Sequence, residues 1–197
     1  MCLNDKTDEE LVKLSLNWNI EGFKEIINRY EKPLMNYISR LVDTTIEQKE
    51  DLLQEIFIKI YKYLNSFDLK LKFSNWIYRI THNYVIDFIR KQERDEKYSF
   101  FINEEEKENF WNEIQGDSDI EKEYLLKERN EIIQKILNSL SEIYKEVLIL
   151  KYFEFKDYKD ISDILKIPEG TVATYLNKAK KQFKEKALYY KLNEYEW

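Results

Sequence analysis

The sequence predicts an all-α protein made of two small helical domains joined by an acidic linker, the C-terminal domain being a helix-turn-helix. Among its 197 residues there are only 3 glycines and 2 prolines, so residues that break helices are scarce. Apolar side chains recur at intervals of three and four residues along most of the chain, which is the period of an amphipathic helix. Aromatic residues make up 15% of the chain, which is enough to build a core despite 36% charged residues.

Four helices are predicted in the first part of the chain, over residues 7–14, 23–41, 46–64 and 74–91. Two of them begin with capping-box patterns, Thr7 with Glu10 and Thr45 with Gln48. Their apolar stripes can bury one shared core, so residues 1–94 are predicted to form the first domain.

An acidic linker is predicted over residues 95–120, because this stretch lacks sustained helical periodicity. Twelve acidic and four basic residues lie between Glu93 and Glu123, a net charge of −8. Bulky apolar side chains also occur in the linker, among them Phe100, Phe101, Ile102, Phe110 and Trp111. So many apolar side chains suggest that the linker docks transiently on another surface or folds partly as a helix.

A second helical domain is predicted over residues 121–197. Helical periodicity resumes over 121–140, and Ser141 is expected to cap the helix that follows. A short helix over 157–165 is then separated from a last amphipathic helix by a break at residues 166–168. A short helix, a break of a few residues and a basic amphipathic helix form the arrangement of a helix-turn-helix.

The charge distribution favours a nucleic-acid partner, although the net charge of the chain is −6. Residues 59–94 carry eight basic and three acidic residues, and residues 166–191 carry seven and two, which gives each segment a net charge of +5. Attraction to phosphate is local, because salt screens it over about 8 Å at physiological ionic strength. Two basic segments on either side of an acidic one therefore predict two nucleic-acid contacts.

The last predicted helix would present its polar face to DNA. Its candidate DNA-contacting residues are Thr171, Ala173, Thr174, Asn177, Lys178, Lys180 and Lys181. Early residues of a recognition helix reach base edges in the major groove, and later lysines can meet phosphates. A lysine-rich helix end alone is more often a solvated surface. The helix-turn-helix arrangement before it favours the DNA-binding interpretation.

The helix predicted over 74–91 also has a polar face. Arg79, Asn83, Ile86 and Arg90 are spaced to lie opposite its apolar stripe. Asn83 can hydrogen-bond a base edge, and the candidates for phosphate contacts are Arg79, Arg90, Lys91 and Arg94. Trp76, Tyr78 and Tyr84 offer stacking surfaces for single-stranded nucleic acid. For Trp76 and Tyr84 a place in the core is favoured, because both lie on the apolar stripe.

No catalytic or metal-binding constellation is visible in the sequence. Cys2 and His82 are the single cysteine and the single histidine, and together they cannot build a zinc site. No run of eighteen apolar residues could span a bilayer, and the first residues lack the apolar core of a signal peptide. We therefore expect a cytoplasmic protein that is not an enzyme, needs no cofactor or metal and does not insert into a membrane.

Three segments, in this order, resemble the extracytoplasmic-function (ECF) group of bacterial RNA polymerase sigma factors. Residues 51–57 (DLLQEIF) resemble the polymerase-binding helix of this family. Residues 76–90, with Trp76-Ile77-Tyr78-Arg79-Ile80 and Asn83, resemble the helix that melts and reads the minus-ten element. Residues 158–172 resemble the helix-turn-helix that reads the minus-thirty-five element. The resemblance covers nearly the whole chain outside the linker.

The resemblance implies that the chain binds core RNA polymerase and promoter DNA and directs transcription initiation. It implies a polymerase contact through the polar side of the third predicted helix: Asp51, Gln54, Glu55 and Ile58. Asn83 would receive a base extruded from the minus-ten element, and residues 171–181 would lie in the major groove of the minus-thirty-five element. Residues 141–153 would meet the polymerase flap, and the linker would enter the channel near the active site. An anti-sigma factor is a further candidate partner.

The recognition helix departs from the family pattern. Family members often carry arginines there, where this chain has lysines and Asn177. Lysine reads guanine less specifically than bidentate arginine, so an A/T-rich minus-thirty-five element is expected.

Two other classes of protein remain open from the residues alone. A stand-alone helix-turn-helix regulator would bind duplex DNA without polymerase, and its N-terminal domain would enclose a ligand pocket. An adaptor or anti-sigma-like protein would bind only other proteins, and it would leave the two basic segments unexplained.

Overall fold

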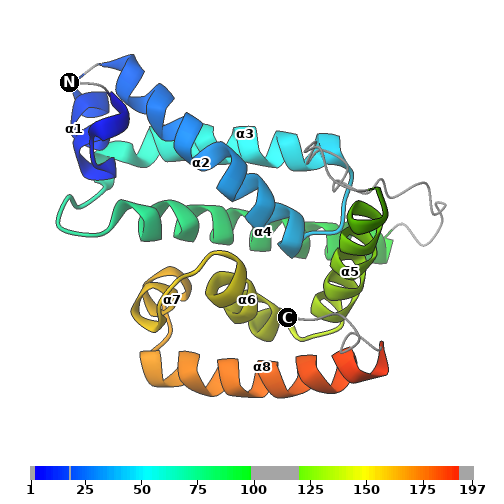
Figure 1. The fold of residues 1–197 in the computed structure, drawn as a ribbon. Helices are drawn as coiled ribbons and strands as arrows, with labels where there is room; N and C mark the ends of the chain where they lie inside the picture. Colours follow the sequence, from blue (N-terminus) through cyan, green and yellow to red (C-terminus); the bar gives the residue numbers. More distant parts are fainter. Residues whose placement is uncertain (1–2, 18, 99–119, 191–197) are drawn as a thin grey trace. The chain divides into compact units, whose positions relative to one another are not determined.

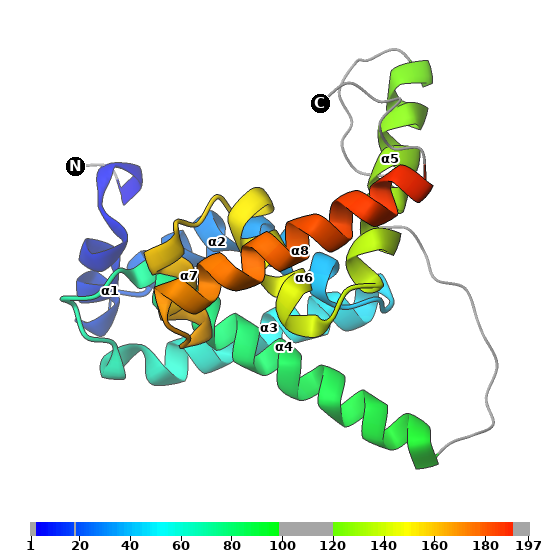
Figure 2. The ribbon, with the colours of Figure 1, turned by 90° about the horizontal axis from the view of Figure 1, so that it is seen from below.

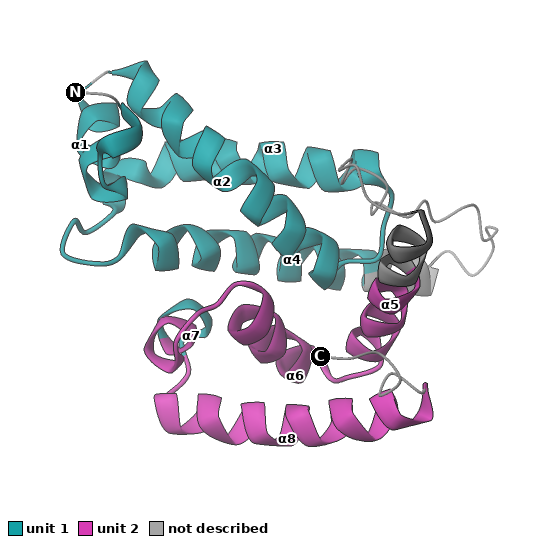
Figure 3. Ribbon diagram, viewed as in Figure 1, with its two compact units in different colours: residues 1–107, 163–166 teal, residues 108–162, 167–197 magenta. Residues whose placement is uncertain are grey.

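A computed structural model describes residues 3–17, 19–98 and 120–190 of the chain (Figure 1). The described residues form helices joined by turns and loops, and none of them is in a strand. The chain divides into two compact units, residues 1–107 with 163–166, and residues 108–162 with 167–197 (Figure 3). The predicted all-α fold with two helical domains is thereby confirmed. Residues 99–119, most of the predicted acidic linker, lie outside the described part.

The N-terminal helices are α1 (Asp8–Leu16), α2 (Ile20–Leu41), α3 (Ile46–Tyr63) and α4 (Phe73–Tyr98). Short 3₁₀ turns cover Leu3–Asp5 and Leu64–Ser66. Helices α2, α3 and α4 pack against one another, and α1 packs across α2 (Figures 1 and 2). A side chain at Gly22 would come within 2.9 Å of the Ser15 Oγ and 3.0 Å of the Leu11 carbonyl oxygen, so this glycine permits the close approach of α1 and α2.

Thr7 and Thr45 cap their helices as predicted. Ser141 occupies the N-cap position of α6 (Glu142–Leu148), but its side chain makes none of the expected capping hydrogen bonds. Thr7 and Glu10 complete a capping box, because the Thr7 Oγ1 accepts from the Glu10 N–H and the Glu10 carboxylate accepts from the Thr7 N–H. Thr45 caps α3 with its hydroxyl oxygen, which accepts from the Gln48 N–H at 3.3 Å. These bonds satisfy backbone donors that a helix start otherwise leaves unpaired.

An aromatic cluster anchors the start of α4 in the core of the first unit. The ring of Phe73 is fully buried, and its centroid lies 5.3 Å from that of Phe67, 5.6 Å from that of Trp76 and 5.9 Å from that of Tyr30. The Glu9 carboxylate of α1 accepts a hydrogen bond from the Phe73 N–H at 3.0 Å. Phe73 is therefore held both by the packing of its ring and by the hydrogen bond from its backbone N–H at the start of α4.

Arg29 of α2 holds the residues that precede α1 in place through hydrogen bonds to their backbone. Its guanidinium donates to the backbone carbonyl oxygens of Leu3, Asn4 and Lys6 and to the Asp8 carboxylate. The Tyr30 hydroxyl donates to the other Asp8 oxygen at 2.6 Å. This arrangement satisfies carbonyl groups that lie outside any α-helix.

Helix α4 and the apolar stripe of α3 differ from the sequence-based expectation. Helix α4 continues to Tyr98, where the sequence pattern predicted an end near residue 91, because residues 92–98 contain no helix breaker although their apolar periodicity has stopped. Tyr61, assigned to the α3 apolar stripe, is 55% exposed and touches Phe23 edge-on at 4.9 Å between ring centroids. It lies at the margin of the stripe, beside α2.

The C-terminal helices are α5 (Ile120–Asn138), α6 (Glu142–Leu148), α7 (Tyr158–Leu165) and α8 (Glu169–Tyr189). A π-helical turn, Ile149–Phe153, continues α6. Helix α8 packs against α6 and, near its C-terminal end, against α5 (Figure 2). The second of these contacts joins Ile132, Ile133 and Ile136 of α5 to Phe183 and Ala187 of α8.

The turn between the π-helical segment and α7 is strained at one residue. Phe155 has a φ angle of 51°, in the left-handed region that side chains other than glycine rarely adopt. Its ring is 87% exposed, so no burial of the side chain offsets the backbone cost. The Lys156 N–H donates to the Leu150 carbonyl oxygen at 2.9 Å and closes the turn.

Candidate nucleic-acid interface

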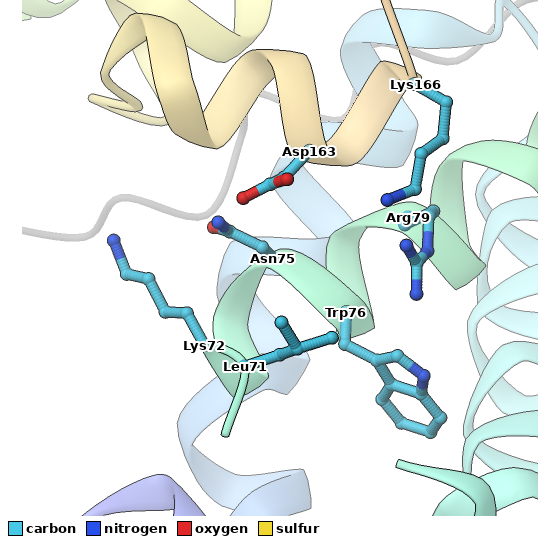
Figure 4. Close-up of a pocket in the computed structure, with 7 residues that line it drawn as sticks. All are labelled: Leu71, Lys72, Asn75, Trp76, Arg79, Asp163 and Lys166. Atoms are coloured by element: carbon cyan, nitrogen blue, oxygen red, sulfur yellow. The ribbon is translucent and has the colours of Figure 1, made fainter. Parts of the chain in front are cut away.

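Helix α4 carries an exposed polar surface along its C-terminal half. Asn83, Arg90, Lys91 and Arg94 are exposed, and Arg79, nearer the start of the helix, is half-buried. We call the four exposed residues the α4 face. The Arg94 Nε donates to the Arg90 carbonyl oxygen at 3.1 Å, which leaves the rest of the Arg94 guanidinium facing outward. Figure 4 shows Arg79 extending from the first turns of α4, three residues after Trp76, with both side chains among those that line one pocket.

Two sequence-based expectations for α4 are wrong. Ile86 is 5% exposed, although it was placed on the polar face with Asn83 and Arg90. Successive residues of an α-helix are rotated by about 100° around its axis, so the exposed residues of α4 centre on a line along the helix through Asn83 and Arg94. Ile86 lies well to one side of this line. Tyr78, a candidate stacking surface, is 4% exposed and packs edge-on against Tyr37 at 5.3 Å between ring centroids.

The other aromatic residues of α4 serve the packing of the first unit. Trp76 is 7% exposed and belongs to the aromatic cluster. Tyr84 is half-buried, and the Lys59 Nζ lies 5.0 Å from the centroid of its ring. Burial, followed by the Glu55 charge, raises the pKa of Tyr84. The place in the core that was favoured for Trp76 is confirmed, and Tyr84 lies at the contact between α3 and α4.

His82 lies next to Asn83 and is held neutral. Burial, followed by repulsion from Arg90, lowers the pKa of His82 from 6.5 to about 4. The folded protein therefore resists protonation that the unfolded chain accepts near pH 6.5. The stability linked to His82 is complete above that pH and is lost as the pH falls toward 4.

We expect the free energy of unfolding to fall by about 2 kcal/mol more between pH 7 and pH 5 in the native protein than in a His82→Gln variant. The difference arises because glutamine does not titrate and every carboxylate is common to both proteins. Urea unfolding at the two pH values measures it. An equal loss of stability in the two proteins would show that His82 is readily protonated in the folded chain.

Helix α3 presents a mixed acidic and apolar surface. Asp51, Gln54 and Glu55 are exposed, and Ile58 is 46% exposed beside them. The opposite side of α3 is buried. Ile56 and the other residues of the apolar stripe point into the core, except Tyr61. The four residues predicted to contact a protein partner are thus brought together on one side of one helix.

Helices α7 and α8 have the local geometry of a helix-turn-helix. The Asp157 carboxylate caps α7 by accepting from the Asp160 N–H at 2.7 Å. Lys166 ends α7 in the left-handed conformation, with a φ angle of 57°. The Ser162 hydroxyl donates to the Ile167 carbonyl oxygen at 2.6 Å, and α8 then begins after Pro168. The turn is therefore fixed by three local features.

Four of the predicted recognition residues share one exposed face of α8. Thr174, Asn177, Lys178 and Lys181 are exposed and follow the spacing i, i+3, i+4 and i+7. The Thr174 hydroxyl donates to the Gly170 carbonyl oxygen at 2.9 Å, so its oxygen can still accept from a base or a water molecule. Thr171 and Ala173 are half-buried at the start of the helix.

Lys180 is placed apart from this face. Its Nζ lies 5.3 Å from the centroid of the Tyr152 ring, on the side of α8 that packs toward α6. A hydrogen bond with Tyr152, its largest electrostatic partner, raises the pKa of Lys180. The lysine is exposed and fully cationic, but its ammonium group is directed to the aromatic ring.

The described part of the chain has neither a cluster of metal-ligating side chains nor a membrane-spanning helix. Residues 3–17, 19–98 and 120–190 contain no group of three histidine, cysteine, aspartate or glutamate residues placed to hold a metal ion. No helix in those ranges has the length and apolar character that crossing a bilayer requires.

Both units match known protein families. The Sigma-70 region 2 family matches residues 26–95, and the Sigma-70 region 4 family matches residues 130–183. The chain is 32% identical to the ECF RNA polymerase sigma factor SigW of Bacillus subtilis, over 84% of this chain and 88% of that protein. It is 28% identical to the ECF RNA polymerase sigma-E factor of Escherichia coli K12, over 91% of this chain and 94% of that protein.

Solved structures share the fold. The sigma factor RpoE from Bartonella quintana, crystallised with the anti-sigma factor NepR, matches 83% of this chain and 95% of its own, with a TM-score of 0.67 and 22% identity. CnrH, solved with the cytosolic domain of CnrY, matches 90% of this chain and 95% of its own, with a TM-score of 0.66 and 17% identity.

In the described residues, two helical units with the basic α4 face and the helix-turn-helix of α7 and α8 have the features of a DNA-binding protein. The chain belongs to the ECF RNA polymerase sigma factors. It binds core RNA polymerase and promoter DNA and directs promoter-specific initiation, with region 2 melting the minus-ten element and region 4 recognising the minus-thirty-five element. The alternative of a stand-alone regulator is not favoured, because the first unit matches region 2.

Proposed function

We propose that the α4 face holds the minus-ten element of the promoter, with Asn83 binding an extruded base. The single observation that carries this assignment is the exposed position of Asn83 on the same helix face as Arg90 and Arg94. An amide presents a donor and an acceptor to a base edge, and the arginines supply charge to the adjoining phosphates. Extruding a base costs a few kcal/mol, which these contacts must offset. Arg79 and Lys91 extend the same phosphate contact.

The exposed side of α3 is proposed as the polymerase contact. Asp51, Gln54 and Glu55 offer carboxylates and an amide to basic and polar groups of the large subunit, and Ile58 adds an apolar contact. Interfaces commonly combine a small apolar centre with polar groups around it. Residues 1–94 would then form one functional domain, in which α3 faces protein and α4 faces DNA.

The recognition helix α8 is proposed to read the minus-thirty-five element, within a C-terminal domain of residues 121–197. Thr174 and Asn177 face base edges, and Lys178 and Lys181 face phosphates. Thr171, Ala173 and Lys180 were assigned to the same interface, and their half-buried or aromatic-facing positions make them secondary contributors. With no arginine on this face, an A/T-rich element is favoured. Selection from random duplexes tests this preference, and enrichment of G-rich sites would refute it.

We expect Lys178→Ala and Lys181→Ala to weaken holoenzyme binding to promoter DNA equally on all minus-thirty-five sequences. Each loss of a phosphate contact should reduce the slope of log affinity against log salt by about 0.9, and the double variant by about 2. Fluorescence anisotropy of labelled promoter duplexes at several salt concentrations measures the slope. Lys13→Ala on α1 is the matched control, because this exposed lysine lies outside both basic segments, and it should leave the slope unchanged. An unaltered slope in the double variant would remove both lysines from the interface.

The protein is proposed to act as a specificity subunit without catalytic activity of its own, in the cytoplasm where core polymerase operates. RNA synthesis would then remain entirely a property of the polymerase. The two matched structures contain an anti-sigma factor and the cytosolic domain of CnrY respectively. We propose an anti-sigma factor as a further partner of this chain, which co-purification from the source cells would test.

Run-off transcription on pooled genomic promoter fragments tests the whole assignment. Core polymerase with the native chain should produce defined start sites that neither component produces alone. The start sites would also reveal the promoter sequence, against which the Asn83 and α8 variants can be compared. Absence of any new start site, with polymerase that is active with another sigma factor, would overturn the proposal.

A further inference from the structure

An apolar pocket lies in the second unit, where α5, the turn after α6 and α8 meet. Its lining residues are Ile133, Leu137, Leu148, Tyr152, Phe153, Lys180 and Phe183. Its volume is about 270 Å³, just under the range of about 300–1,000 Å³ typical of pockets for small-molecule ligands. A pocket of this size and character suits one or two large apolar side chains from a peptide.

The positive charge at the rim of the pocket favours an occupant that carries negative charge. Tyr152 is 44% exposed at the rim, and the Lys180 Nζ lies over its ring. Lys180 is the charged member of the lining set. An occupant that fills the pocket with aromatic side chains and carries carboxylates beside them would satisfy both features.

Residues 108–119 of the same chain have this composition. The segment reads Glu-Asn-Phe-Trp-Asn-Glu-Ile-Gln-Gly-Asp-Ser-Asp, with four acidic residues and no basic one. Its apolar residues are Phe110, Trp111 and Ile114. These residues are unusual in an acidic segment, and the polymerase-channel role that the family resemblance implies for the linker does not account for apolar side chains.

The segment is long enough to reach the pocket. Trp111 precedes the first residue of α5, Ile120, by nine residues, which span about 30 Å when extended. Ile133 lies thirteen residues into α5, about 20 Å from the start of the helix at 1.5 Å per residue. A chain that turns back along α5 can therefore bring Trp111 over the pocket.

We propose that residues 108–114 dock in the apolar pocket of the second unit in the free protein. Phe110 and Trp111 fill the apolar part, and Glu113 lies near Lys180. Covalent attachment to α5 raises the effective concentration of the segment to the millimolar range, so modest contacts suffice. The segment shields an apolar surface that would otherwise be exposed to water.

Docking has a consequence for assembly with polymerase, and this consequence rests on the proposed function. The π-helical turn that contributes Tyr152 and Phe153 lies within residues 141–153, the part assigned to the polymerase flap. The segment must then leave the pocket when the holoenzyme forms. Docking itself is independent of that assignment and can be tested on the chain alone.

Disulfide trapping in the full-length chain tests the docking directly. In a Cys2→Ser background, Asn112→Cys, which keeps Phe110 and Trp111, is combined either with Tyr152→Cys at the pocket rim or with Phe155→Cys. Phe155 is the matched control, because it is an exposed aromatic three residues away that does not line the pocket. We expect the Tyr152 pair to form its disulfide at least tenfold faster under the same redox buffer. Equal rates for the two pairs would overturn the proposal.

The C-terminal segment is the competing occupant, since residues 191–197 contain Tyr195 and Trp197 with two glutamates. The rate of disulfide formation between Trp197→Cys and Tyr152→Cys measures whether this segment occupies the pocket. Faster trapping from residue 197 than from residue 112 would overturn the proposal in favour of that segment.

Tryptophan fluorescence provides a second measurement that needs no cysteine. The difference in emission between the native chain and a Trp111→Phe variant isolates Trp111, and acrylamide quenching reports its exposure. We expect Lys180→Glu to increase the quenching of Trp111 at least twofold. Lys184→Glu is the matched control, because Lys184 is exposed on the same helix outside the lining set. The same effect from both charge reversals would overturn the proposal.

Discussion

Replacing Asn83 with alanine is expected to reduce promoter opening by about 10- to 100-fold while leaving assembly with core polymerase intact. The amide is exposed on the α4 face, between the half-buried Arg79 and the exposed Arg90. Loss of two hydrogen bonds to an extruded base removes about 1.5–3 kcal/mol of the free energy that offsets unstacking. Abortive transcription and permanganate reactivity of unpaired thymines measure opening, and co-elution with polymerase measures assembly.

The matched control for this prediction is Asn65→Ala. Asn65 is an exposed asparagine of the same unit, in the 3₁₀ turn after α3 and away from the α4 face. It should leave opening within about twofold of the native level, which corresponds to less than about 0.5 kcal/mol. If both variants opened promoters equally well, Asn83 would not hold a base. A fall in polymerase binding by Asn83→Ala would instead place the residue at the protein interface.

The sequence was sufficient to predict the helices and their beginnings because these depend on short-range chemistry. The capping box at Thr7 and the cap at Thr45 need only residues three positions away. Asp51, Gln54, Glu55 and Asn83 were placed on polar helix faces by periodicity, and all four are exposed. Surface position follows from pattern when one side of a helix is clearly apolar.

Other features depend on packing that periodicity does not encode. Ile86 and Tyr78 are buried because the contact surface of α4 is wider than its apolar stripe, with Tyr37 covering Tyr78 from another helix. Lys180 was assigned to the same face as Lys181, although at about 100° per residue it lies about 40° from the apolar Leu176 and Lys181 about 140°. That spacing was the available signal, and the ring of Tyr152 beside the Lys180 ammonium depends on packing. The pocket beside Lys180 joins residues from three segments. The unbroken run from residue 92 to Tyr98 was the signal that could have predicted the longer α4.

Replacing Phe73 with alanine is expected to lower the stability of the first unit by about 3–5 kcal/mol, the usual cost of removing a buried phenylalanine ring. The ring is fully buried and lies within 6 Å, centroid to centroid, of three other aromatic rings. The neighbouring rings are rigid and packed on the surrounding core, so they can close only part of the cavity that the phenyl ring leaves. A domain of this size is commonly stable by about 5–15 kcal/mol, so the loss is a large fraction. Hydrogen exchange in α2, α3 and α4 under mild denaturant measures it.

Phe23→Ala is the matched control, because Phe23 is a half-buried aromatic residue of the same unit whose ring partner Tyr61 is itself exposed. Its removal should cost about 1–2 kcal/mol, since water can occupy much of the space that the ring leaves. Equal destabilisation by the two variants would mean that the aromatic cluster does not determine the stability of the first unit. If Phe73→Ala is the more damaging, loss of promoter opening should accompany unfolding, because the helix that begins at Phe73 carries Asn83. At temperatures where the variant remains folded, opening should recover, and this separates a structural role for Phe73 from the direct role proposed for Asn83.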